Sequence, residues 1–196
     1  MNKKKYTVFI IAGILLVLVI DLVTTYNSLV KKDEKVKLQW NEVQNTYQRR
    51  LSLIPNLVNT VKGQADFEQT TLQMITDARS KAASVSLTGD NVTADQYNRQ
   101  TDVQNDLASA TNHLLISIEK YPTLKGTAAF VGLQTQLEGT EHRIKIARKD
   151  FNDAVAEYNK SVRSFPTNLS AGILGFKSKE GFQADTGSDK SIEIKF

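Results

Sequence analysis

The sequence predicts an all-α protein: an N-terminal transmembrane helix followed by an antiparallel up-and-down four-helix bundle. The first observation behind this prediction is an uninterrupted apolar run near the N-terminus. The second is that apolar residues recur every three or four positions through most of the remaining chain, which is typical of half-buried helices. The third is that 196 residues contain only 3 prolines and 10 glycines, few for the many turns of a β protein.

The apolar run extends from Val8 to Ile20, and the segment from Tyr6 to Val23 would form about 27 Å of helix. This length is close to the roughly 30 Å hydrocarbon core of a bilayer. We therefore predict a transmembrane helix over residues 6–25 that contacts the lipid bilayer. The basic N-terminus, residues 1–5, contains three lysines, so the positive-inside rule predicts a cytoplasmic N-terminus and an extracytoplasmic remainder.

A cleaved signal peptide is the alternative, because it also combines a basic start with an apolar stretch. No pair of small residues suited to cleavage follows the run, and the chain continues with a helical pattern. These features favour an uncleaved anchor.

The first bundle helix follows the anchor, and its apolar stripe includes Trp40, Val43, Tyr47 and Leu51. We expect it to end at 52–55, because proline in a helix interior removes a hydrogen bond. A second helix would then extend to residue 84. The alternative has three long helices with the first kinked at Pro55, but an unbroken helix over 26–84 would be about 90 Å long.

The third helix is predicted over 94–121, where Thr93 and Gln96 form a capping-box pattern and Pro122 follows the end. The fourth is predicted over about 127–165 and ends before Pro166. Its stripe is the most regular in the chain: Phe130, Leu133, Leu137, Ile144, Ala147, Phe151, Ala154, Tyr158, Val162 and Phe165.

The bundle domain is expected to occupy residues 26–176, followed by a mobile polar C-terminal tail over 177–196. The topology returns the fourth helix toward the membrane. Apolar residues after it would therefore lie near the bilayer surface and either cap the open end of the bundle or touch lipid: Leu169, Ile173, Leu174 and Phe176. Capping is the favoured interpretation, because bundle ends need apolar cover.

The residue inventory disfavours catalysis. The chain has no cysteine and only 2 histidines, and no nucleophile triad, phosphate loop or pair of acids stands out. We therefore predict no catalytic residue, cofactor or metal. The net charge of +4 is not gathered into a basic face with interleaved aromatics, so nucleic-acid binding is not expected.

Distinctive blocks of sequence occur in order at residues 26–30, 40–43, 48–58, 137–152 and 158–176. In their residues, order and spacing these blocks resemble the LemA family of bacterial membrane proteins. Ser52 and His142 depart from the residues usual in the family. The resemblance implies a single-pass bacterial membrane protein with a helical-bundle domain, and it does not point to any particular enzymatic activity.

The signature block contains Arg49 and Arg50, and two interpretations of it remain open. In the first, Arg50 and Glu141 form a buried ion pair that fixes the register of the bundle. In the second, Arg49, Arg50 and Asn56 form a surface patch for a partner. Glu141 could also pair with Arg143 or Lys145 on its own helix.

These predictions lead to a non-enzymatic scaffold or adaptor that presents an extracytoplasmic bundle to protein partners or to a second copy. The alternative is an oligomeric protein that organises the membrane or contacts lipid.

Overall fold

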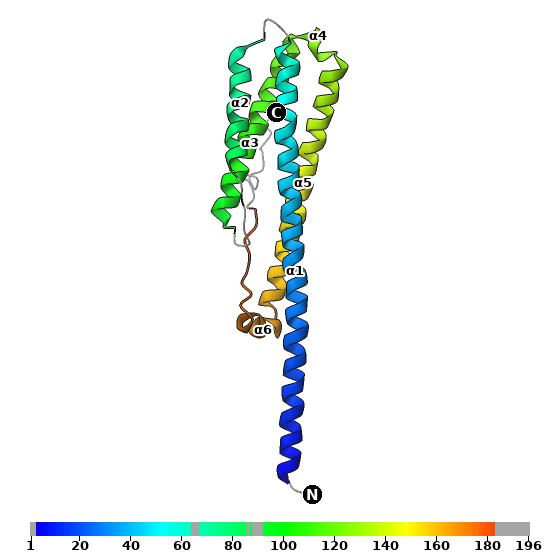
Figure 1. Cartoon of the computed structure of the whole chain (residues 1–196), viewed down its shortest axis with the longest axis vertical. Coiled ribbons are helices and arrows are strands. Elements are labelled where there is room, and N and C mark those ends of the chain that lie inside the picture. The colour runs from blue at the N-terminus through cyan, green and yellow to red at the C-terminus, as the bar shows by residue number, and fades with distance from the viewer. Residues whose placement is uncertain (1–2, 64–66, 86, 88–91, 183–196) are drawn as a thin grey trace, which may run out of the picture. The chain divides into compact units, whose positions relative to one another are not determined.

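The computed structural model describes residues 3–63, 67–85, 87 and 92–182, and this part of the chain is helical without a β-strand. Its elements are α1 (Lys3–Lys62), α2 (Gln69–Ser84), α3 (Ala94–Ser117), the 3₁₀ turn η1 (Ile118–Lys120), α4 (Pro122–Lys125), α5 (Ala128–Arg163) and α6 (Thr167–Ile173) (Figure 1). The all-α prediction is confirmed for these residues. Residues 88–91, between the predicted second and third helices, and the chain after Phe182 lie outside them.

The chain divides into two compact units, to which both α1 and α5 contribute. Unit 1 contains the described residues up to Gln39 together with Asp150–Lys179. Unit 2 contains Trp40–Lys149 and continues from Glu180. The predicted domain 26–176 is therefore shared between the two units.

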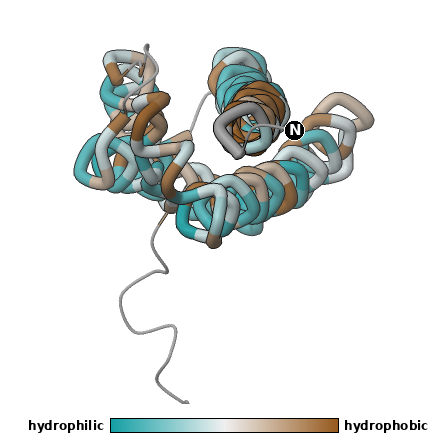
Figure 2. The backbone as a smooth tube through the Cα atoms, turned by 90° about the horizontal axis from the view of Figure 1, so that it is seen from below, coloured by the Kyte–Doolittle hydropathy of each residue, from teal (hydrophilic) through white to brown (hydrophobic). Residues whose placement is uncertain are grey.

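In unit 1, the first stretch of α1 carries apolar side chains that none of the other described elements covers. Those of residues 8–20 are exposed, and the stretch is long and apolar enough to cross a membrane. Figure 2 shows it as hydrophobic turns near the N-terminus. Beyond it, α1 packs with α5 and α6 around a small core of Leu29, Val36, Phe151, Val155, Tyr158, Val162 and Ala171.

Unit 2 has a larger core, built from the C-terminal part of α1, from α2 and α3, and from the N-terminal part of α5. Helices α2 and α3 lie side by side (Figure 1). Thr93 caps α3 through the predicted capping box with Gln96, which is thereby confirmed. The core residues include Ile54, Leu57, Val61, Leu72, Ile75, Leu107, Leu114, Ile118, Phe130 and Leu137.

The predicted helix break at 52–55 is wrong, because α1 continues through Pro55 to Lys62. Proline lacks the N–H that would bond to the carbonyl of Leu51, four residues earlier. Arg79 of α2 replaces that donor: its Nε donates to the Leu51 carbonyl oxygen at 3.1 Å. The helix can continue because a side chain 28 residues away satisfies the freed carbonyl.

Candidate functional site

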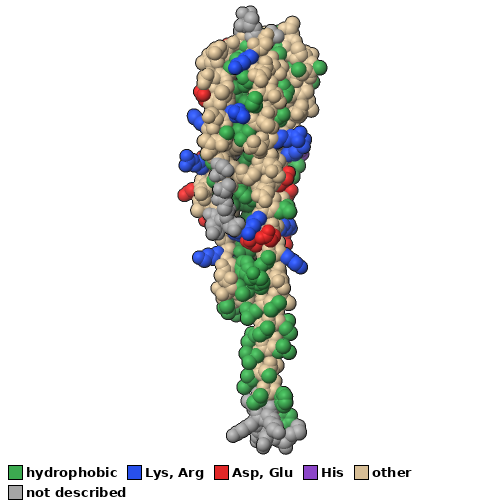
Figure 3. Space-filling view, viewed as in Figure 1, with side chains coloured by type: hydrophobic (Ala, Val, Ile, Leu, Met, Phe, Trp, Pro, Cys, Tyr) green, Lys and Arg blue, Asp and Glu red, His purple; other side chains and the backbone are tan. Residues whose placement is uncertain are grey.

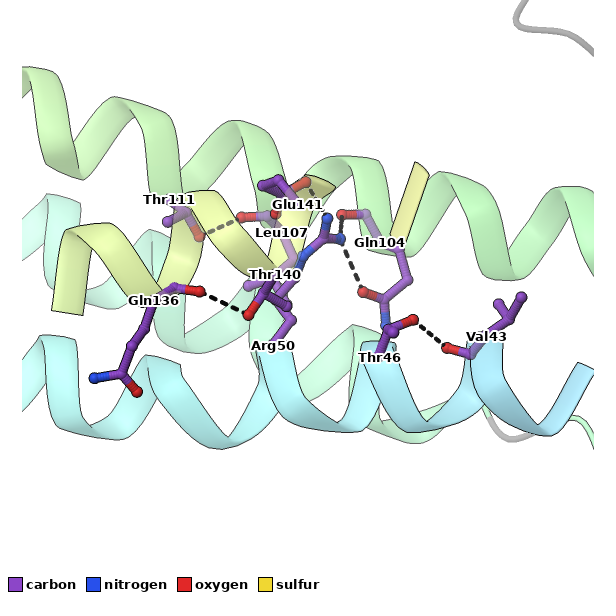
Figure 4. A network of polar contacts seen from close by, with 9 residues as sticks. All are labelled: Val43, Thr46, Arg50, Gln104, Leu107, Thr111, Gln136, Thr140 and Glu141. Atoms are coloured by element: carbon purple, nitrogen blue, oxygen red, sulfur yellow. Dashed lines mark hydrogen bonds and ion pairs between the residues drawn. The ribbon is translucent and has the colours of Figure 1, made fainter. Parts of the chain in front are cut away.

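Arg50 lies at the centre of a polar network inside unit 2. Arg50 is only 3% exposed. A charged side chain is rarely buried to this extent unless its charge is paired. Nη1 donates to the backbone carbonyl of Gln104 at 2.9 Å and to its side-chain Oε1 at 3.0 Å. Nη2 donates to the carboxylate of Glu141. One guanidinium thereby connects α1, α3 and α5 (Figure 4).

The structure thus brings Arg50 and Glu141 together and removes Arg50 from any surface patch. The Glu141 side chain remains 41% exposed, so its carboxylate lies at the border between the core and water. Arg50 Nε, by contrast, is buried without a hydrogen-bond partner among the described residues. The pair is therefore buried on the arginine side and hydrated on the glutamate side.

Threonine hydroxyls near Arg50 bond to their own helices. Thr46 donates to the carbonyl of Val43, Thr111 to that of Leu107 and Thr140 to that of Gln136, each at 2.7 Å (Figure 4). A hydroxyl bonded in this way is satisfied locally, which allows it to be buried between helices at little cost. Close by in sequence, the amides of Gln44 and Gln100 exchange two hydrogen bonds of 3.1 Å between α1 and α3.

Tyr47 is buried one helical turn before Leu51. Its hydroxyl has no well-formed hydrogen bond within the described part of the chain. Burial raises the pKa of Tyr47, an effect only partly offset by Arg148, Arg50 and Thr101 nearby. The raised pKa keeps the Tyr47 phenol neutral at ordinary pH.

Arg49 and Arg143 occupy a polar groove on the surface beside this network. The groove has a volume of about 500 Å³ and is lined by Glu42, Asn45, Thr46, Gln48, Arg49, Ser52 and Arg143. Arg49 and Arg143 are both exposed, and Arg143 Nε donates to the Gly139 carbonyl at 3.3 Å. Asn56 is exposed on α1 but does not line the groove. Of the three residues of the predicted surface patch, Arg49 lines this groove, Arg50 is buried and Asn56 lies outside the groove, and partner binding by Arg49 stays a prediction.

An aromatic cluster in unit 2 involves a residue that the sequence pattern did not reveal. The Phe182 ring lies 5.8 Å from Trp40 and 5.3 Å from Tyr97, and the Arg148 guanidinium lies 4.8 Å above it. Burial and the nearby Glu180 raise the pKa of Tyr97 to about 12. Phe182 is buried although it belongs to the predicted mobile tail, so the start of that tail is held in place.

Within unit 1, ion pairs connect α1 with the C-terminal half of α5. Lys35 Nζ donates to Glu157 at 2.8 Å, and this bond raises the pKa of Lys35 and lowers that of Glu157. Lys179 pairs with Asp33 at 2.9 Å, and Asn159 holds the backbone of Lys179 through two hydrogen bonds. These contacts hold the chain after α6 against unit 1.

The predicted apolar group after α5 separates into two kinds of side chain. Leu169 is 61% and Ile173 78% exposed. Leu174 and Phe176 are half-buried, and the Phe176 ring lies 5.9 Å from Tyr26.

Among the residues that the structure describes, no three histidine, aspartate or glutamate side chains gather where they could hold a metal ion.

Comparisons with known proteins identify the family of this chain. The family model described as the LemA family matches residues 39–196. Magnetosome protein MamQ 2 of Paramagnetospirillum magneticum is 26% identical over 188 residues, covering 87% of this chain and 69% of that protein. Magnetosome protein MamQ of Magnetospirillum gryphiswaldense is 25% identical and covers 91% and 72%. Protein LemA of Metamycoplasma hominis is 24% identical and covers 81% and 68%. Because the family model matches most of the chain, the protein belongs to the LemA family.

Proposed function

We propose that the protein is a non-enzymatic, single-pass membrane scaffold whose unit 2 docks a protein partner in the Arg49–Arg143 groove. In this proposal α1 crosses the bacterial cytoplasmic membrane with its N-terminus inside, and unit 2 is extracytoplasmic. The lysines at residues 3–5 support the orientation. We also propose that the helical segments of unit 2 form an antiparallel up-and-down bundle.

The observation that carries the docking proposal is that two neighbouring arginines of α1 differ in burial: Arg50 is buried, and Arg49 is exposed. Arg50 fixes α1 against α3 and α5 from within, while neighbouring Arg49 projects into the groove with Arg143 of α5. A groove whose walls are held in register is pre-organised, which reduces the ordering cost of binding.

The charge of the groove indicates the chemistry of the partner. Its lining contains two arginines and one glutamate, Glu42. Arginine recognises carboxylates through two parallel hydrogen bonds, so a partner surface with exposed aspartate or glutamate side chains fits best.

The test is quantitative co-purification of the full chain from its native membranes. Arg49→Glu with Arg143→Glu reverses the charge of the groove, and Arg99→Glu makes the same change at an exposed site of α3. We expect a defined set of envelope proteins to be retained by wild type and by the Arg99 variant and lost from the double variant. Equal recovery from all three would contradict docking in this groove.

The alternative function, an oligomeric membrane-organising protein, has its own support. Relatives named as magnetosome proteins match this chain over most of its length. The exposed apolar side chains of α6 also favour contact with lipid. Scaffolding and lipid contact can coexist, because they use different units.

A further inference from the structure

We infer that α6 and the preceding Phe165 form an interfacial foot, defined by Phe165, Leu169 and Ile173, that inserts into the headgroup boundary of an anionic bilayer on the side where α1 leaves it. This inference rests on the membrane anchoring proposed above and adds a second contact between the protein and lipid. The foot residues are 80%, 61% and 78% exposed, which is unusual for large apolar side chains so close together in sequence.

A hydrogen bond sets the level of the foot along α1. Ser170 of α6 donates from its hydroxyl to the Asp21 carboxylate at 2.9 Å. Asp21 directly follows the apolar run of residues 8–20, so α6 lies beside the end of the segment that can cross a membrane. Ile20 and Val23 of α1 are also more than half exposed at this level, and they extend the apolar surface of the foot. Figure 3 shows hydrophobic side chains over α6 and the adjoining stretch of α1.

The length of the anchor is consistent with this level. Residues 6–23 form about 27 Å of helix, slightly less than the roughly 30 Å hydrocarbon core. The Asp21 level therefore falls at the boundary between acyl chains and headgroups. Apolar side chains of interfacial helices reach about 5–10 Å into this zone.

The orientation of α6 is fixed by the way in which the helix ends. Gly175 has φ +79°, which a glycine adopts without strain, and the Phe176 N–H donates to the Ala171 carbonyl at 3.0 Å. Together with the bond from Gly175 N–H to the Gly172 carbonyl, this is a Schellman motif. It directs Phe176 onto Tyr26, buries Ser170 and Ala171, and leaves Leu169 and Ile173 facing outward.

The charge around the foot selects anionic lipid as its occupant. Residues 160–179 contain Lys160, Arg163, Lys177 and Lys179 and no acidic residue. Lys179 is paired with Asp33, and the acidic group that α1 places beside α6 is Asp21, whose carboxylate accepts from Ser170. Lys160, Arg163 and Lys177 are exposed. Cations beside an apolar interfacial face strengthen its binding to negatively charged headgroups.

The test is fluorescence quenching of the full chain in vesicles of phosphatidylcholine and phosphatidylglycerol. Part of the phosphatidylcholine is brominated near the glycerol end of its acyl chains. Trp40 is the single tryptophan, so Trp40→Phe provides a silent background. Into this background Leu169→Trp or Ile173→Trp is introduced, with Phe9→Trp as the bilayer control and Leu38→Trp as the matched exposed control. Leu38 is 62% exposed in the same unit and lies about 25 Å along α1 from Asp21.

We expect brominated lipid to reduce the emission of the Leu169→Trp and Ile173→Trp variants about twofold, as for a side chain at the acyl boundary. The emission of Leu38→Trp should not change. Replacing phosphatidylglycerol with phosphatidylcholine should weaken the quenching at residues 169 and 173 but not at Phe9→Trp.

Two results would overturn the inference while Phe9→Trp remains quenched. Unquenched, red-shifted emission from residues 169 and 173 would place the foot in water. Unquenched, blue-shifted emission would place it against protein, such as a second copy of the chain. Loss of quenching at Phe9→Trp as well would instead refute the membrane anchoring itself.

Discussion

At the residue scale, Arg50 shows how one buried charge can specify the contact of three helices. Its guanidinium makes hydrogen bonds to α3 and an ion pair to α5 while its own backbone belongs to α1. A buried arginine without its carboxylate partner is costly, because the charge loses water without compensation. Glu141 is partly exposed and can be rehydrated. The two ends of the pair should therefore respond unequally to mutation.

The first prediction follows from this asymmetry. Glu141→Gln should lower the free energy of unfolding, because it leaves the Arg50 charge buried and uncompensated. Adding Arg50→Met to this variant should recover part of the lost free energy of unfolding. We expect a coupling energy of about 1–3 kcal/mol between the two substitutions. Urea unfolding of the full chain in detergent, followed through Trp40 fluorescence, measures the free energy of unfolding of the wild type, the two single variants and the double variant. Additive losses would show that the pair does not couple the helices.

The second prediction concerns alkaline pH. The pKa of Tyr97 is raised from 10.0 to about 12, so the folded state holds its proton where the unfolded state has lost it. This stability is fully present below pH 10 and is lost as pH rises toward about 12. Burial raises the pKa of Tyr47 and Tyr158 in the same direction.

Tyr97→Phe keeps a ring against Trp40 and Phe182 but removes the ionisable group. The variant should therefore lose less of its free energy of unfolding than wild type between about pH 10 and about pH 12. Urea unfolding at a series of pH values measures the difference. Parallel pH curves for the two proteins would contradict the assignment.

At the element scale, the continuity of α1 through Pro55 depends on a contact from another helix. The third prediction is that Arg79→Met lowers the free energy of unfolding by about 1–2 kcal/mol, because the Leu51 carbonyl loses the donor that Arg79 supplies at the proline gap. In a Pro55→Ala background the alanine N–H can bond to that carbonyl. Arg79→Met should then cost much less, as thermal or urea unfolding of the four proteins would reveal. An equal cost in both backgrounds would mean that Arg79 acts elsewhere.

The helices show how far local pattern determines this fold. Predicted helices over 94–121 and about 127–165 agree closely with α3 plus η1 and with α5, because apolar periodicity and caps are local signals. The end of α1 was misplaced because the donor that compensates Pro55 comes from Arg79, and no local pattern reveals such a pairing. Phe182 was missed for a similar reason: a single aromatic in a polar segment gives no periodic signal.

The candidate site was only partly predictable. The juxtaposition of Arg50 and Glu141 follows from two charged residues that lie on or beside apolar stripes of different helices. The contribution of Gln104 was not foreseen, since a neutral amide on a helix carries no sign of its partner. The direction in which Leu169 and Ile173 face depends on Ser170 and Gly175, whose roles appear only once α6 is placed against α1.

At the scale of the whole molecule, the two units carry different tasks in this account. Unit 1 contains the segment that can cross a membrane together with α6, and its apolar surface suits lipid. Unit 2 contains the larger core and the Arg49–Arg143 groove, and its polar surface suits a protein partner.

Site-specific photo-crosslinking in native membranes tests this central claim most directly. A photo-reactive residue at Ser52 lies in the groove, and one at Ser80, an exposed serine of α2, serves as the matched control. We predict that Ser52 gives adducts with distinct envelope proteins, that Arg143→Glu abolishes them, and that Ser80 does not form them. Identical adducts at both positions, or adducts at Ser52 only with further copies of this chain, would contradict the proposed docking of a separate protein partner.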